Sequence, residues 1–116
     1  MKKLFTLFTI SIIAVLFSTA AFAHPPKSVS LSWDSKSEVL TVKAEHKVNS
    51  TTQHYVISVA VTQDGNQLAQ KRYTSQTSAD SFSDNIHLKG LKSGSKISVS
   101  LTCNIMGTAQ TDYIIP

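Results

Sequence analysis

The sequence predicts an all-β domain, an immunoglobulin-like antiparallel β-sandwich of about seven strands. Three observations lead to this fold class. Short segments alternate apolar with polar residues at a period of two and are rich in β-branched side chains. Turn-forming residues separate these segments at short intervals. No segment after residue 23 shows a convincing amphipathic helix, and the chain has no internal repeat.

The strand pattern is clearest near the two ends of the domain. In residues 28–33, Val29, Leu31 and Trp33 alternate with serines, and every second residue from Ile97 to Cys103 is apolar. Residues 55–62 are β-branched and almost continuously apolar, whereas the pattern in 67–75 and 81–88 is weaker. The expected strands cover residues 28–33, 38–46, 55–62, 67–75, 81–88, 95–103 and 110–116.

The connections between these strands differ in length and composition. Asp34-Ser35-Lys36 and residues 89–95 have turn chemistry, and Asp64-Gly65-Asn66 is a strong β-hairpin signal. The longest polar stretch is residues 46–54. Because functional side chains gather on loops held by a rigid scaffold, we expect this connection to contribute to any site.

The first 23 residues have the features of a secretory signal peptide. Two lysines precede an apolar run over residues 4–17, and Ala21-Phe22-Ala23 forms an A-x-A cleavage site. The run is too short for a membrane span of ~20 residues, although an uncleaved anchor is an alternative. We therefore expect cleavage after Ala23, export to the periplasm, and a single domain of residues 24–116 with no membrane attachment.

Charge and composition exclude several function classes. Residues 24–116 keep 9 of the 11 basic residues and all 7 acidic ones, a formal net charge of +2, and show no basic cluster interleaved with aromatic residues. Nucleic-acid binding therefore has little support. Neither a Ser/His/Asp arrangement, a Gly-rich phosphate loop nor an HExxH motif is present, so nothing specific indicates a hydrolase.

Four histidines and one cysteine are the residues most able to support chemistry. Taken singly, Cys103 can be a small buried hydrophobe, and His24, His46, His54 and His87 can be exposed polar residues. Taken together, imidazole and thiolate are the ligands of borderline and soft transition metals. An unpaired cysteine in an oxidising compartment is also explained if its thiolate binds a metal.

Three segments in order resemble the iron-binding segments of the desulfoferrodoxin/neelaredoxin family, the superoxide reductases. They are HPP (24–26), HKVNSTTQHYV (46–56) and CNIMG (103–107). The family reads roughly K-H-V-P, then H-P-N-x-x-x-H-H-I, then C-N-x-H-G. The resemblance implies an immunoglobulin-like sandwich, in agreement with the strand pattern.

The resemblance also implies a site and an activity. In that family four histidine nitrogens surround a non-haem iron, a cysteine sulfur binds axially, and the open position receives superoxide. Ferrous iron gives superoxide one electron, and protons complete hydrogen peroxide. Matched by motif, His24, His46, His54 and Cys103 are expected metal ligands, Cys103 is the catalytic thiolate, and Met106 falls where the last histidine would be. The electron donor and the oligomeric state are left open.

The chain departs from the family pattern at three places. Met106 replaces an imidazole with a softer thioether, and the connection between His46 and His54 is two residues longer. The family's lysine before the first histidine is absent, because Ala23 stands there. These differences bear on turnover more than on metal binding.

Three hypotheses follow from the sequence. The first is an exported iron protein of superoxide reductase type, with activity lowered by Met106. The second is a periplasmic metal-binding protein without turnover, more suited to copper because its donors are soft. In that case the free α-amine of His24 could join its imidazole as a chelate. The third is a β-sandwich adhesion or interaction domain with incidental histidines.

Overall fold

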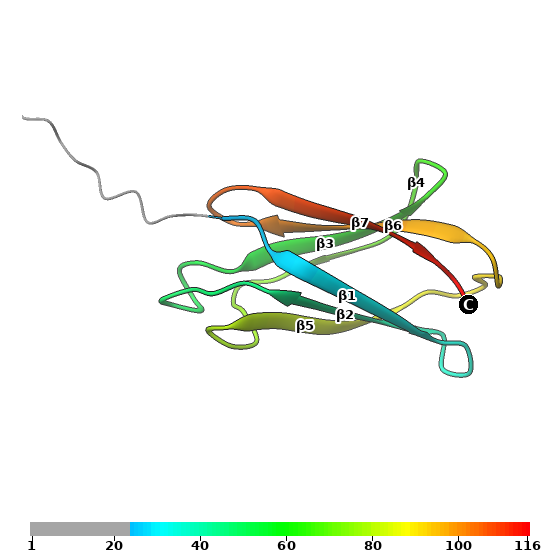
Figure 1. Cartoon of the computed structure of the whole chain (residues 1–116), viewed down its shortest axis with the longest axis horizontal. Coiled ribbons are helices and arrows are strands. Elements are labelled where there is room, and N and C mark those ends of the chain that lie inside the picture. The colour runs from blue at the N-terminus through cyan, green and yellow to red at the C-terminus, as the bar shows by residue number, and fades with distance from the viewer. Residues whose placement is uncertain (1–23) are drawn as a thin grey trace, which may run out of the picture.

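The computed structural model describes residues 24–116, and the expected signal peptide lies outside the described residues. Seven strands form two facing sheets, which confirms the expected all-β sandwich (Figure 1). The strands are β1 (Lys27–Asp34), β2 (Val39–Glu45), β3 (Val56–Gln63), β4 (Asn66–Arg72), β5 (Ser81–His87), β6 (Lys96–Cys103) and β7 (Thr108–Ile114). In this part of the chain, no helix is long and apolar enough to cross a membrane.

The strand order explains how residues far apart in sequence meet. One sheet has the order β1-β2-β5 and the other the order β4-β3-β6-β7, with all pairings antiparallel. In the larger sheet, β3 lies beside β6, and Val56 at the start of β3 pairs with Cys103 at the end of β6. The polar connection before β3 and the turn after β6 therefore leave the sandwich at the same end.

The β3–β4 hairpin follows the turn signal read in the sequence. Asp64 and Gly65 both have positive φ, 50° and 78°, and Gln63 pairs with Asn66 across them. Positive φ at both central residues is the geometry that matches the twist of a two-residue hairpin. Most expected strand boundaries shift by one to three residues, and one shift concerns the site: β2 ends at Glu45, so His46 stands just outside the strand rather than in it.

The core lies between the sheets and is made by the inward positions of the strands. In β6 the buried residues alternate strictly, and Cys103 continues this inward row. The core cluster contains Leu40, Val42, Ala44, Val56, Val59, Val61, Phe82, Ile86, Leu88, Ile97, Val99, Leu101 and Ile115. Burial of so many aliphatic side chains at ~1.5–3 kcal/mol each explains why a disulfide-free domain of this size can fold.

One end of the sandwich collects four segments without regular structure. They are residues 24–26 before β1, 46–55 between β2 and β3, 73–80 between β4 and β5, and 104–107 between β6 and β7 (Figure 1). Backbone hydrogen bonds join them: the His46 N–H donates to the Asp80 carbonyl at 3.0 Å, and the Gln76 N–H donates to the Thr51 carbonyl at 3.0 Å. The candidate site lies within this set of loops.

Candidate metal centre

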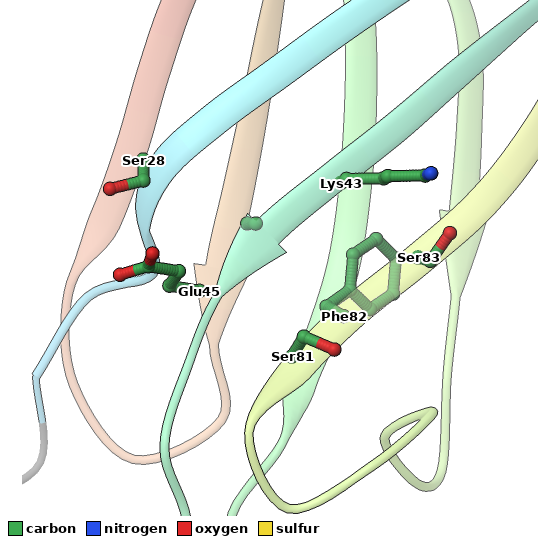
Figure 2. Close-up of a pocket in the computed structure, with 7 residues that line it drawn as sticks. Ser28, Lys43, Glu45, Ser81, Phe82 and Ser83 are labelled. Carbon is green, nitrogen blue, oxygen red and sulfur yellow. The ribbon is translucent and has the colours of Figure 1, made fainter.

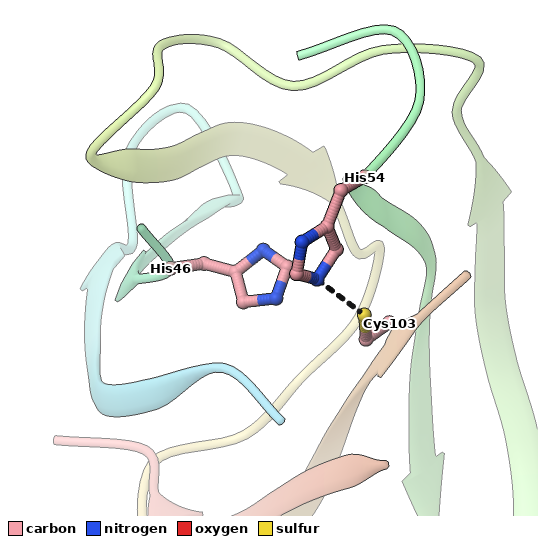
Figure 3. A group of neighbouring side chains, drawn as sticks. All are labelled: His46, His54 and Cys103. Carbon is pink, nitrogen blue, oxygen red and sulfur yellow. Dashed lines mark hydrogen bonds between the residues drawn. The ribbon is translucent and has the colours of Figure 1, made fainter. Parts of the chain in front are cut away.

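His46, His54 and Cys103 bring their donor atoms together at this end of the sandwich. One donor atom from each residue lies within 4.8 Å of the others. The His54 Nε2 atom is 3.1 Å from the Cys103 Sγ atom (Figure 3). The ring centroids of His46 and His54 are 4.7 Å apart, with an angle of 85° between the ring planes. Three of the residues singled out from the sequence therefore form one compact group.

The spacing of these donors suits a first-row transition metal. Ligand bonds of ~2.1 Å to nitrogen and ~2.3 Å to sulfur, taken from zinc sites and set at a right angle, put the two donors ~3.1 Å apart. The observed distance between His54 and Cys103 has this value, at which the thiol and the imidazole also form a hydrogen bond with each other. Two imidazoles and a thiol are also the donor types that such metals prefer. The residues present therefore fit a metal ion.

His24 is the third imidazole at the site, and it lies beside the compact group. Its ring centroid is 5.1 Å from that of His46 and 5.7 Å from that of His54. Its Nε2 atom lies 3.1 Å from the Lys47 carbonyl oxygen and its Nδ1 atom lies 3.3 Å from the Pro25 carbonyl oxygen, so the two ring nitrogens compete for the one hydrogen of the neutral ring. His24 is thus close enough to join a metal with a modest movement, and its role as a ligand stays a prediction.

Both sheets contribute to the group. His46 follows β2 of the three-stranded sheet, whereas His54 precedes β3 and Cys103 ends β6 of the four-stranded sheet. His46 is fully buried, and Cys103 is 4% exposed. A metal held by all three would therefore join the two sheets.

Asn104 fixes His54 relative to Cys103, a role that the sequence interpretation did not give it. The Tyr55 N–H donates to the Asn104 Oδ1 atom at 2.9 Å, and the Asn104 N–H donates to the Tyr55 carbonyl at 3.0 Å. The Asn104 Nδ2 group donates to the Gln53 carbonyl at 3.0 Å. These bonds hold the residues on both sides of His54 against the turn that follows Cys103.

The turn after Cys103 also positions His24. The Cys103 N–H donates to the Gly107 carbonyl at 2.9 Å, which closes the turn. Gly107 has a φ of +91°, and a Cβ atom added there would lie 3.0 Å from the Cβ and Cδ atoms of Pro25. Glycine is required both by the backbone conformation and by the close approach of Pro25, the neighbour of His24.

Met106 and His87 lie outside the buried group. Met106 is 64% exposed in the turn after Cys103, so its thioether is largely in solvent, and its role as a ligand stays a prediction. His87 is exposed and ends β5, where it pairs with Val39 at the start of β2. It therefore stands at the opposite end of the sandwich from His46, which follows the last residue of β2.

The electrostatic surroundings favour neutral imidazole and attract anions. Burial, and then the charges of His46 and His24, lower the pKa of the His54 imidazole below its ordinary value. Neutral imidazole is the form that offers a lone pair to a metal. Beside His24, a hollow of about 310 Å³ is lined by Pro25, Lys27 and Lys47. The sequence interpretation did not include these two lysines in the site.

A second hollow, of about 400 Å³, lies along β1, β2 and β5 (Figure 2). The residues that line it are Ser28, Lys43, Ala44, Glu45, Ser81, Phe82 and Ser83. It contains neither imidazole nor thiol among its lining residues. We therefore assign the candidate chemistry to His46, His54 and Cys103, whose metal-binding atoms lie close together, and not to this hollow.

Comparison with known proteins connects the fold to one group of structures. No protein-family model and no curated protein matches the sequence. Among solved structures, the chain is similar to superoxide reductase (1Fe-SOR) from Giardia intestinalis, with a TM-score of 0.53 and 15% identity over 80% of this chain and 98% of that one. It is similar to a superoxide reductase in the oxidised state, with a TM-score of 0.50 and 13% identity over 80% of this chain and 90% of that one. A hypothetical protein from Pyrococcus horikoshii OT3 matches with a TM-score of 0.50 and 9% identity over the same shares. At these identities the likeness shows that the chain has the β-sandwich fold of superoxide reductases.

Proposed function

We propose that this chain is an exported non-haem iron protein that reduces superoxide to hydrogen peroxide. The observation that supports this most directly is the group of His46, His54 and Cys103, whose donors lie within 4.8 Å of one another. The fold shared with solved structures of superoxide reductases points to the same chemistry. His24 completes the proposed ligand set, because its ring lies beside both other imidazoles.

Each proposed ligand has a distinct part. The Cys103 thiolate supplies negative charge and electron density, as thiolates do in other iron sites. His54 is kept neutral by its surroundings, so its lone pair is available. Ferrous iron, when bound, supplies the single electron that superoxide gains, and two protons complete hydrogen peroxide. An electron donor not yet identified must then return one electron to the protein.

Lys27 and Lys47 are proposed to attract the anionic substrate. Both ammonium-bearing side chains line the hollow beside His24. Superoxide carries one negative charge, and positive groups around a hollow raise the local concentration of anions and their association rate. The family's lysine before the first histidine is replaced by Ala23 in this chain. Lys27 and Lys47, which follow His24 in the sequence, are proposed to supply positive charge in its place.

The test is elemental analysis of the purified native protein followed by an activity assay. We expect about one iron per chain, and superoxide decay that yields peroxide without release of oxygen. Decay that releases oxygen indicates dismutation instead. Protein that contains no transition metal and binds none on titration contradicts the proposal.

A copper-binding protein without turnover is the second candidate, and the histidine count favours it. All four histidines lie within residues 24–116, and His87 is at the far end of the sandwich. The site can therefore gather only three imidazoles, and the thioether of Met106 is the soft group nearest in sequence to Cys103. Such a set suits copper. Competition between Fe²⁺ and Cu⁺ for the purified protein, together with absence of superoxide reduction, distinguishes this candidate.

Export remains part of the proposal and rests on residues 1–23. The A-x-A pattern ending at Ala23 supports cleavage directly before His24, which would give that residue a free α-amine next to the other imidazoles. N-terminal sequencing and the intact mass of protein from the periplasmic fraction test this. A mature start two or more residues away removes the α-amine from any ligand set.

A further inference from the structure

Gln76 is a buried polar residue next to the site, and every hydrogen-bonding atom of its side chain has a partner. It lies in the 73–80 connection and is 6% exposed. Its Nε2 group donates to the His46 carbonyl at 2.7 Å and to the Ser78 carbonyl at 2.9 Å. Its Oε1 atom accepts from the Val56 N–H at 3.3 Å and lies 2.7 Å from the His46 Nδ1 atom.

These backbone partners fix the orientation of the amide. Two carbonyl oxygens can only accept, so the Gln76 NH₂ group must face His46 and Ser78. The Val56 N–H can only donate, so the Gln76 carbonyl oxygen must face it. A flipped amide would oppose oxygen to oxygen twice and leave the Val56 N–H facing a donor.

A fixed amide determines the tautomer of His46. The Gln76 Oε1 atom is an acceptor and lies 2.7 Å from the His46 Nδ1 atom, the shorter of the two contacts that the ring nitrogens make, so we assign the hydrogen to Nδ1. In neutral imidazole the other nitrogen, Nε2, then has the lone pair. A histidine that binds a metal commonly donates its second ring N–H to a fixed acceptor in this way.

The Nε2 side of His46 meets a second acceptor, and the shorter, 2.7 Å contact of Nδ1 with Gln76 decides between the two neutral tautomers. Nε2 lies 3.1 Å from the His24 carbonyl oxygen, so in this tautomer two acceptors face each other. A bound cation relieves such a contact, because both atoms can turn toward positive charge. Gln76 therefore leaves His46 with its lone pair on the side where His24 lies.

Gln76 also holds both ends of the 46–55 connection. It bonds the His46 ring and carbonyl at the start and the Val56 N–H after the end. The backbone N–H of Gln76 donates to the Thr51 carbonyl within the loop at 3.0 Å. Through its side chain and its backbone N–H, Gln76 thus sets both the tautomer of His46 and the path of the loop that contains His54.

We propose that Gln76 is the positioning residue of the metal centre, which holds His46 as the Nδ1–H tautomer with Nε2 presented to the metal. This inference rests on the proposed metal-binding function. It adds a residue that does not contact the metal and acts through His46.

The first test uses the wild-type protein freed of metal by chelation. Two-bond ¹H–¹⁵N spectra at about pH 8, well above the ordinary imidazole pKa of ~6.5, report which nitrogen of each ring carries hydrogen. We expect Nδ1–H at His46. The Nε2–H tautomer, or a doubly protonated ring at this pH, overturns the proposal. This measurement needs neither iron nor superoxide, so it stands apart from the outcome of the functional assay.

The second test compares Gln76→Met, Gln76→Glu and Thr77→Val. Gln76→Met keeps the length of the side chain but removes the acceptor, so we expect mixed tautomers at His46 and a ~10–100-fold weaker affinity for Zn²⁺ used as a redox-inert probe. Gln76→Glu keeps an acceptor for Nδ1–H but loses both donated bonds. It should lower stability while retaining the tautomer and most of the Zn²⁺ affinity.

Thr77→Val is the structural control in the same loop. It removes the Thr77 Oγ1 bonds to the Ser83 backbone without touching His46. We expect reduced stability with an unchanged tautomer and unchanged Zn²⁺ affinity. Equal losses of affinity in Thr77→Val and Gln76→Met, or none in Gln76→Met, would show that Gln76 only supports the loop. If Gln76→Met does not fold, the wild-type spectrum and the Gln76→Glu variant still decide the question.

Discussion

His54 and Cys103 are 49 positions apart in the chain, yet their Nε2 and Sγ atoms lie 3.1 Å from each other. The pairing of Val56 with Cys103 in adjacent strands brings them together. Asn104 then fixes the residues around His54 through three hydrogen bonds. An imidazole and a thiol held at this distance by strand pairing and by the hydrogen bonds of Asn104 are already arranged for a shared metal ion.

Replacing Cys103 by serine should therefore remove most of the metal affinity. Serine keeps the size and burial of the side chain but offers a poorer donor than thiolate to iron or copper. Since loss of an outer-shell partner costs ~10–100-fold in affinity, loss of a direct ligand should cost at least that. The measurement is metal content per chain after dialysis against a weak chelator. His87→Gln, at the far end of the sandwich, is the control and should retain the metal. Retention of metal by Cys103→Ser would place the ion elsewhere.

Neutralising Lys27 and Lys47 should slow superoxide reduction and weaken its dependence on salt. The two ammonium groups line the hollow beside His24, and an anion approaching it feels both. We expect the double variant to glutamine to lower the second-order rate constant by up to about tenfold at low ionic strength. The difference should shrink above ~0.15 M salt, where the Debye length falls to ~8 Å. Lys89→Gln, two residues after His87, should change neither quantity.

Replacing Gly107 by alanine should disturb the site, whereas the same change at Gly94 should not. Both glycines have positive φ, +91° and +84°, so the backbone strain is similar. Only at Gly107 would the new Cβ atom meet Pro25 at 3.0 Å, while at Gly94 nothing lies within 4 Å. We expect Gly107→Ala to lose about 1–3 kcal/mol in the free energy of unfolding and also to weaken metal binding, because Pro25 adjoins His24. Urea unfolding and Zn²⁺ titration measure the two effects. Equal behaviour of the two variants would remove the role given to Pro25.

Met106→His should raise iron affinity and superoxide reduction together. Residue 106 lies in the tight turn after Cys103, and its side chain is 64% exposed, so an imidazole can be accommodated without disturbing the core. A fourth imidazole suits iron better than a thioether, and we expect at least a ~10-fold gain in Fe²⁺ affinity over Cu⁺ relative to wild type. Ile105→His, an exposed neighbour in the same turn, is the matched control. A gain in both variants would indicate a nonspecific effect, and a gain in neither would mean that residue 106 does not face the metal.

The strands could be predicted from the sequence because apolar and polar residues alternate along each of them, and this pattern involves only neighbouring positions. The row from Ile97 to Cys103 gave the inward face of β6, and Asp64-Gly65 gave the hairpin. His46 and His54 lie at the two ends of one polar connection in the sequence. This position predicted that both would lie at the same end of the sandwich.

The residues that complete the site could not be found in this way. Gln76 stands in a polar segment, and its burial arises only when the 73–80 connection packs against the 46–55 connection. Lys27 lies three residues after His24, and Lys47 lies one residue after His46, so no common spacing marks the two lysines. The β1–β2 pairing, which places Lys27 opposite Glu45, brings them to the same hollow. Such roles depend on tertiary contacts and not on any local periodicity.

The proposed metal ligands come from the ends of strands in two different sheets, and this affects how much of the protein a cell retains. A ligand that binds only the folded state adds RT ln(1 + [L]/Kd) to its stability, about 4 kcal/mol when free metal is a thousand times Kd. Here that free energy would act where the ends of β2, β3 and β6 can separate, since His46 follows a strand of one sheet, whereas His54 precedes and Cys103 ends a strand of the other. Amide exchange in residues 44–57 and 101–104 should therefore slow on metal addition more than exchange around the β3–β4 hairpin. Chains that never acquire metal would open at this end more often and would be degraded sooner, so metal supply would set the protein's lifetime as well as its activity.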